Sequence, residues 1–211
     1  MSDGARYPVP ASRHRAEQTI ERSRFLCTIA PATTPAEAQA FIRELNPEFP
    51  DATHNCWAYV IGPPGSTSQV GMSDAGEPHG TAGRPMLTVL LHSGVGDVAS
   101  VVTRWYGGVK LGTGGLVKAY GGAVLNALAS LPKSERIDYV ELVVSFDYAA
   151  VESVKQLASR HEAELLAEEY AAAVRYRMRV PRPALPELRA ALLDATRGRA
   201  DIRETDDGRP E

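Results

Sequence analysis

Asp74, Glu77 and Arg84 stand close together in the segment SDAGEPHGTAGRPM, which covers residues 73–86. Two carboxylates beside a guanidinium are a set with which an enzyme moves a proton and holds an anionic substrate. On that interpretation Asp74 or Glu77 is the base and Arg84 is the anion clamp. The serine, aspartate and glycine that open the segment are also typical of a turn, so the alternative is a capped turn that lies in solvent.

A second segment, TRWYGGVKLGTGGLVKAYGG at residues 103–122, combines glycines with basic residues and holds no acid. Glycines let the chain turn sharply after a strand, and the start of a helix offers unpaired N–H groups that suit a phosphate. The spacing matches neither the P-loop nor the dinucleotide-binding pattern, and the alternative is a connector whose glycines permit close packing. The anion- or nucleic-acid-binding residues that we predict are Arg84, Arg104, Gly107, Gly108, Lys110, Gly112, Gly114, Gly115 and Lys118.

Charge is balanced over the whole chain but not along it. The 211 residues carry a formal net charge of −3, which excludes bulk electrostatic attraction to nucleic acid or to a membrane. No acid occurs between Asp97 and Glu135. The basic residues in that stretch are Arg104, Lys110, Lys118 and Lys133. An anion site in this protein is therefore a local patch.

His54 and Cys56 alternate along a predicted strand and so share one face, as a catalytic Cys–His pair requires. The alternative, a packed strand, is favoured by Trp57 and Tyr59 on the opposite face. Aromatic side chains that either stack on bases or belong to the core are Trp57, Trp105, Tyr106 and Tyr120.

Arg175, Arg177 and Arg179 point to one face of another predicted strand, and such a ladder is suited to following phosphates. The alternative is a solvated sheet face whose arginines pair with glutamates of a neighbouring strand, namely Glu164, Glu168 or Glu169. The histidines show no zinc-site spacing, so we predict neither a metal nor another cofactor.

Local signals place the two motifs on alternating strands and helices. Thr34 is a predicted N-cap, Pro35 follows it, and apolar residues continue at helical spacing to Leu45. The other predicted elements are a strand or hairpin at 17–29, strands at 54–62 and 97–106, and helices at 85–94 and 114–131.

The segment PKSERID, at residues 132–138, is the predicted junction to a second domain. Beyond it the pattern predicts strands at 139–148, 163–170 and 171–181, helices at 149–161 and 184–198, and a short last strand. The resulting order, β-α-β-β-α-β, is that of a ferredoxin-like domain. We therefore predict an α+β protein.

The predicted division of the chain is a mobile N-terminus (1–15), a first domain (16–132), a ferredoxin-like domain (136–206) and a frayed tail (207–211). The N-terminus has no apolar core like that of a secretory signal, and no run of about 18 apolar residues predicts a membrane span. Cys27 and Cys56 have neither disulfide-framework nor metal-site spacing, so we expect reduced thiols in a cytoplasmic protein.

The segments SRFLCTIAP, DATHNCWAYVIG, SDAGEPHGTAGRPML and VVTRWYGGVKLGTGGLVKAYGGA closely resemble the YigZ/IMPACT family, in matching order and spacing from about residue 17 to 131. The pattern after residue 135 is similar to the C-terminal domain of the bacterial members. The resemblance implies a first, IMPACT-type domain like the βαβ-rich second domain of a small-subunit ribosomal protein. It also implies a ferredoxin-like second domain similar to the last domain of elongation factor G.

Eukaryotic members of that family regulate translation under amino-acid starvation, so the resemblance implies a translation-related regulator. We expect a binding module that contacts RNA, the ribosome or a translation-related protein through the basic glycine-rich loop, rather than an enzyme. The first alternative is an enzyme that acts on a small phosphorylated or acylated metabolite. The second is a protein-interaction adaptor in which the two motifs are mainly structural.

Overall fold

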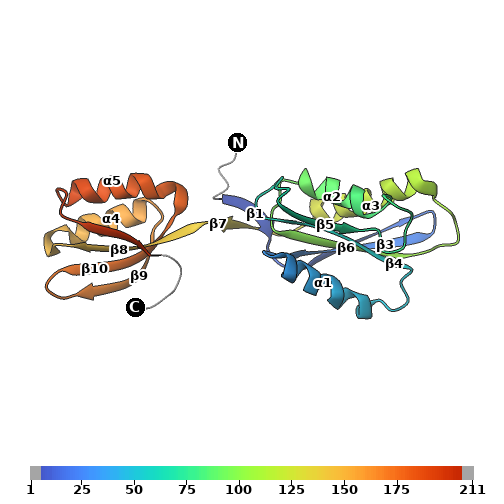
Figure 1. The fold of residues 1–211 in the computed structure, drawn as a ribbon, viewed down its shortest axis with the longest axis horizontal. Helices are drawn as coiled ribbons and strands as arrows, with labels where there is room; N and C mark the ends of the chain where they lie inside the picture. The colour runs from blue at the N-terminus through green and yellow to red at the C-terminus, as the bar shows by residue number, and fades with distance from the viewer. Residues whose placement is uncertain (1–5, 206–211) are drawn as a thin grey trace. The chain divides into compact units, whose positions relative to one another are not determined.

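The computed structural model describes residues 6–205, which form two compact units (Figure 1). The first unit runs from Tyr7 to Arg136, and the second begins at Ile137. This division falls within the segment 132–138 that the sequence marks as a junction. Each unit has its own cluster of buried apolar side chains, as an independently folding domain requires.

The first unit is built around a five-stranded sheet whose strands lie in the order β2-β3-β6-β4-β5, and β1 and β7 form a separate two-stranded sheet. Its elements are β1 (Arg6–Pro10), β2 (His14–Ile20), β3 (Ser23–Pro31), α1 (Pro35–Glu48), β4 (His54–Ile61), β5 (Gln69–Ser73), α2 (Gly83–Leu91), β6 (Val98–Trp105), α3 (Gly112–Ala129) and β7 (Lys133–Ile137).

Strand β1 corrects an expectation from the sequence, which assigned residues 1–15 to a mobile segment. Residues 1–5 lie outside the described residues, but Arg6–Pro10 pair with β7, and β2 begins at His14. The strand is also held from the side, because the Tyr7 hydroxyl donates a hydrogen bond of 2.8 Å to the Asp97 carboxylate. The expectation therefore does not hold for residues 6–15.

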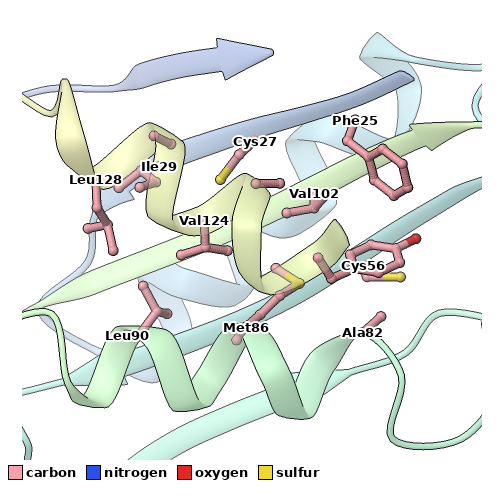
Figure 2. Close-up of a cluster of buried hydrophobic side chains, with 14 of the residues drawn as sticks. Phe25, Cys27, Ile29, Cys56, Ala82, Met86, Leu90, Val102, Val124 and Leu128 are labelled. Atoms are coloured by element: carbon pink, nitrogen blue, oxygen red, sulfur yellow. The ribbon is translucent and has the colours of Figure 1, made fainter. Parts of the chain in front are cut away.

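Helices cover both faces of the five-stranded sheet (Figure 1). Helices α2 and α3 pack on one face and α1 packs on the other. Figure 2 shows Met86 and Leu90 of α2 and Val124 and Leu128 of α3 gathered with the buried side chains of the strands. The central strand β6, between these layers, is consequently buried on both faces.

The local helix signals in the sequence are confirmed. The Thr34 hydroxyl accepts a hydrogen bond of 3.1 Å from the Glu37 N–H, and Pro35 is the first residue of α1. Helices α2 and α3 begin slightly earlier than predicted, at Gly83 and Gly112. Glycines of the second motif thus belong to the first turn of α3.

Strand β6 lies at the centre of the sheet and carries Arg104 near its end. It pairs antiparallel with β3 on one edge and with β4 on the other. In these registers Arg104 stands opposite Phe25 of β3 and His54 of β4. The chain leaves the sheet just beyond this point and turns toward α3, so Arg104 lies where sheet, loop and helix meet.

The second unit is a four-stranded antiparallel sheet with the strand order β11-β8-β10-β9. Its elements are β8 (Tyr139–Phe146), η1 (Tyr148–Ala150), α4 (Val151–Arg160), β9 (Glu164–Tyr170), β10 (Val174–Pro181), η2 (Arg182–Ala184), α5 (Leu185–Ala195) and β11 (Asp201–Thr205). The order of strands and long helices is β-α-β-β-α-β, so the ferredoxin-like prediction and the α+β class are confirmed. The predicted frayed tail at 207–211 lies outside the described residues.

Candidate functional site

A pocket of about 400 Å³ forms where β6 ends, and it joins the two motifs that the sequence singled out. Glu77 and Pro78 come from the segment after β5, whereas Arg104 and Lys110 come from β6 and the glycine-rich loop. The other lining residues are Thr53, His54, Tyr106, Leu111, Gly112, Thr113 and Leu116. The volume is within the range of small-molecule sites in proteins.

A buried ion pair forms the inner wall of this pocket. The Arg104 Nη1 donates to the Glu77 Oε1 at 2.5 Å, and the Tyr120 hydroxyl donates to the same oxygen at 2.7 Å. Only 5% of Arg104 and 8% of Glu77 is exposed to solvent. Since charges are taken out of water here, each partner depends on the other to remain buried.

The guanidinium of Arg104 keeps unused hydrogen-bonding capacity. It has five N–H donors, and among residues 6–205 its one side-chain hydrogen bond is that to Glu77. Its Nε is buried and has no partner within that part of the chain. Tyr106, which is about half exposed, lies with its ring centroid 5.6 Å from the Arg104 Cζ. The pocket therefore presents a fixed cation beside an accessible aromatic ring.

The start of α3 adds positive potential at the pocket. Gly112 and Thr113 line it, and the N-cap position, Leu111, offers no side-chain oxygen to the first N–H groups of the helix. The first turn holds no acid, and the exposed Lys110 directly precedes it. An uncapped helix start with a neighbouring lysine attracts anions, because its N–H groups and the helix dipole both favour negative charge.

The glycines of the loop serve the backbone in different ways. A Cβ on Gly107 would stand 2.0 Å from the backbone carbonyl carbon of Arg22, so this position accepts no side chain. Gly108 and Gly112 have φ values of +84° and +69°, the left-handed region that favours glycine. A Cβ on Gly114 would meet nothing within 4 Å. Close packing and turning thus explain Gly107, Gly108 and Gly112 without a ligand.

His54 and Cys56 do not form a catalytic pair. The His54 Nδ1 lies 2.9 Å from the Ala75 carbonyl oxygen, which only accepts, so Nδ1 carries the proton and Nε2 of the neutral ring is the acceptor. That Nε2 is 4.0 Å from the Glu77 Oε1. The Cys56 thiol instead donates to the Asp74 carbonyl oxygen, and burial raises the pKa of Cys56 to about 12. His54 therefore faces the pocket, whereas Cys56 is an inert core thiol.

The Asp74 side chain binds backbone N–H groups and does not line the pocket. Its carboxylate accepts hydrogen bonds of 2.8–3.0 Å from the N–H groups of Gly80, Ala82 and Gly83, which lead into α2. Partial burial opposes ionisation, but these three donors outweigh it and lower the pKa of Asp74. The two carboxylates that the sequence offered as alternative bases are thus separated, since Asp74 holds the start of a helix and Glu77 lines the pocket.

The predicted basic residues are divided as well. Arg104 and Lys110 line the pocket, whereas Arg84 and Lys118 line a second hollow between α2 and α3. Sequence reasoning did not identify Tyr120 as a partner of Glu77, and it did not place Thr113 at the site. The Tyr120 contact lacks a local signal, because a tyrosine in an apolar helix has no pattern that names a carboxylate as its partner.

In the second unit, the predicted arginine ladder is largely neutralised by its neighbouring strand. Arg179 pairs with Glu164 at 2.6 Å, and Arg175 lies 3.7 Å from Glu169.

Over residues 6–205, no three His, Cys, Asp or Glu side chains are grouped as a metal site would need. The helices in that range are too short or too polar for a membrane span.

Comparison with known proteins identifies both units. Residues 21–128 match the Impact N-terminal domain, and residues 144–199 match a domain of unknown function, DUF1949. The IMPACT family member YigZ of Escherichia coli (strain K12) is 40% identical over 190 residues, which cover 90% of this chain and 93% of that protein. The IMPACT family member YvyE of Bacillus subtilis (strain 168) is 37% identical and covers 89% of this chain and 86% of its own.

More distant relatives match about half of this chain. Protein IMPACT-A of Xenopus tropicalis is 35% identical over 107 residues, which make up 49% of this chain and 33% of that protein.

A solved crystal structure of a hypothetical protein is 37% identical, covers 97% of this chain and 99% of its own, and superposes with a TM-score of 0.67. On these matches and on the motifs around Glu77 and Arg104, the chain belongs to the IMPACT family.

Proposed function

We propose that the protein is a translation-related RNA-binding factor of the cytoplasm, and that its pocket receives one unpaired nucleotide of RNA, free or in the ribosome. The observation that carries the proposal is the buried Arg104, which Glu77 holds in place while most of its donors have no protein partner in residues 6–205. A cation fixed in this way binds a phosphate without first ordering its own side chain.

The surroundings of Arg104 suit a single-stranded nucleotide better than a duplex. Tyr106 presents an exposed ring on which a base stacks, and Lys110 with the start of α3 offers positive charge for the phosphate. A pocket of about 400 Å³ admits a single splayed-out nucleotide but not a double helix. Proteins that recognise single-stranded RNA combine these same elements of stacking and phosphate attraction.

The test is binding of a labelled single-stranded RNA of about ten nucleotides, measured by fluorescence anisotropy from about 50 to 200 mM salt. Lys110→Ala should weaken binding and reduce the slope of log K against log salt by about 0.7, the value for one phosphate contact of a single strand. Tyr106→Ala should cost about 1–3 kcal/mol, the worth of one stacked base.

The matched control is Lys133→Ala, which removes another exposed lysine of the acid-free stretch outside the pocket. It should bind like the wild type. Wild-type binding that does not change with salt, or equal losses in Lys110→Ala and Lys133→Ala, would refute the proposal. Arg104→Ala is unsuitable here, because it leaves Glu77 buried without its cation.

A specific observation also favours the enzyme alternative, with a small phosphorylated or acylated metabolite as substrate. His54 holds its Nδ1 on the Ala75 carbonyl, which leaves Nε2 at the pocket near Glu77, where a general base is needed. A thermal-shift screen of phosphorylated metabolites tests it. The enzyme alternative predicts three results. One metabolite stabilises both the wild type and His54→Asn, only the wild type turns that metabolite over, and the wild type does not bind RNA.

A further inference from the structure

A second hollow of the first unit lies between α2 and α3 and is apolar. Its volume is about 500 Å³. We call it the α2/α3 groove, and its apolar lining comprises Pro85 and Val89 of α2 and Val117, Gly121 and Leu125 of α3. Unlike the pocket at Arg104, it contains neither a carboxylate nor an aromatic ring. This chemistry differs from that of a phosphate site.

At the groove, α3 has a glycine where it meets α2. A Cβ on Gly121 would lie 3.7 Å from a Val89 methyl carbon and 3.9 Å from the Pro85 Cβ, so the helices approach closely at this point. Val117 and Leu125 lie one turn before and one turn after Gly121 on the same side of α3. They are 41% and 58% exposed, respectively. The result is an apolar stripe on an exposed helix face, which marks an interaction site.

The charges at the groove are of one sign. Arg84 is the one charged residue of α2, and Lys118 is the one charged residue of α3. Within residues 6–205 neither side chain makes an ion pair, although other arginines of the same unit do, such as Arg13 with Glu44 and Arg15 with Glu48. The groove thus combines an apolar lining with two unpaired cations.

We infer that the α2/α3 groove binds a short amphipathic helix of a partner protein, whose apolar residues pack on Val117 and Leu125 and whose carboxylates pair with Arg84 and Lys118. Helix-in-groove recognition needs an apolar stripe whose anchors are spaced by whole helical turns, and Val117 and Leu125 lie about two turns apart on one side of α3. The inference does not depend on RNA binding at the other pocket.

The lining of the groove argues against two other occupants, an RNA base and a second copy of this chain. RNA bases are most often held by aromatic stacking and by hydrogen bonds to their edges. Apart from Arg84 and Lys118, the groove offers only aliphatic carbon, glycine and one threonine, Thr88, whose hydroxyl already donates to the Arg84 carbonyl. A second copy that docked through the same face would bring Arg84 and Lys118 against their own charges, because α2 and α3 contain no acid.

The test is selection of binders from a library of helix-forming peptides of about 18 residues, displayed on phage and presented to the full chain. Enriched peptides should carry apolar residues at spacings of three and four together with an excess of Asp and Glu. One such peptide is then made with a fluorescent label, and its affinity is measured by anisotropy.

Val117→Asp and Leu125→Asp should each weaken the peptide roughly tenfold, because a charge replaces an apolar contact. Lys118→Glu should weaken it about fivefold and remove most of its salt dependence. The matched control is Met72→Asp, which changes another exposed apolar residue, on β5 and outside the groove. It should bind like the wild type. Since all these side chains are exposed, unchanged urea unfolding checks that each variant is folded.

Three results would overturn the inference. The first is the selection of peptides that have no excess of Asp and Glu, or of peptides whose affinities do not change in Val117→Asp, Leu125→Asp and Lys118→Glu. The second is RNA affinity that falls in Lys118→Glu but not in Lys110→Glu, which would make the groove a nucleic-acid site. The third is concentration-dependent self-association in sedimentation that Leu125→Asp abolishes, which would make the occupant a second copy.

Discussion

Removing one member of the buried pair at the pocket should unfold the first unit far more easily. In Arg104→Met the Glu77 carboxylate stays buried, with one hydrogen bond left, from the Tyr120 hydroxyl, and with the His54 Nε2 4.0 Å away, among the interactions described for residues 6–205. Breaking a buried pair by removing one partner typically costs about 3–5 kcal/mol. Domains of this size are stable by about 5–15 kcal/mol, so the loss is a large part of the total.

Trp57 and Trp105, the chain's two tryptophans, both belong to the first unit, so tryptophan fluorescence during urea unfolding reports on that unit alone. With a slope of about 2 kcal/mol per molar urea, the midpoint should fall by about 1.5–2.5 M. Glu77→Gln should have a comparable effect, because it leaves the Arg104 charge buried and unpaired.

The double variant Glu77→Gln/Arg104→Met separates pairing from packing. It removes both buried charges of the pair, so its stability should exceed that of both single variants and lie within about 2 kcal/mol of the wild type. If Arg104→Met loses less than about 1 kcal/mol, or if the double variant loses the sum of the two single losses, the pair is not coupled and the reasoning fails.

Three further predictions use the same fluorescence signal or the thiols. Gly107→Ala should lower stability by several kcal/mol, since its Cβ would meet the Arg22 backbone, whereas Gly114→Ala should be neutral or stabilising by up to about 1 kcal/mol; equal effects would contradict this account. Cys27 and Cys56 should react with a thiol reagent at pH 8 only as fast as the protein unfolds, because burial raises the pKa of both; reaction of either in the folded state would show an accessible thiolate. Asp74→Asn should reduce stability by a constant amount from pH 8 to about pH 5. The folded pKa of Asp74 is lowered, so its contribution to the free energy of unfolding is complete above the unfolded value of about 3.9 and declines as pH falls further. A stability difference between wild type and variant that grows in acid would contradict this prediction.

Much of the fold was predictable because its signals are local. The cap and proline of α1, at Thr34 and Pro35, specify a helix start within a few residues. The alternation from Tyr139 to Phe146 likewise marks a strand with one buried face. Strand β1 was missed because its residues, Arg6–Pro10, carry two prolines and no alternation, and what orders them is a distant partner strand and a hydrogen bond to Asp97.

The site was predictable in its residue types but not in their partners. Glu77 and Arg104 were both singled out, yet their contact joins positions 27 apart that only the folded sheet brings together. One available signal was overlooked. Arg104 ends a run of apolar residues on a strand buried on both faces, and a charge in such a strand needs a counter-charge. That argument predicts a buried ion pair, although it does not name Glu77.

The central position of β6 has a consequence for how the pocket moves. Because β6 is hydrogen-bonded along both edges, the wall that carries Arg104 should open only when the whole unit unfolds. The loop from Gly108 to Leu111, which contributes Lys110 and Leu111 to the pocket, is irregular and belongs to no sheet or helix. Amide hydrogen exchange should therefore be slowest in β6 and fast in this loop. A ligand would then be detected as slowed exchange from Gly108 to Leu111, while the amides of β6 would report only on global stability.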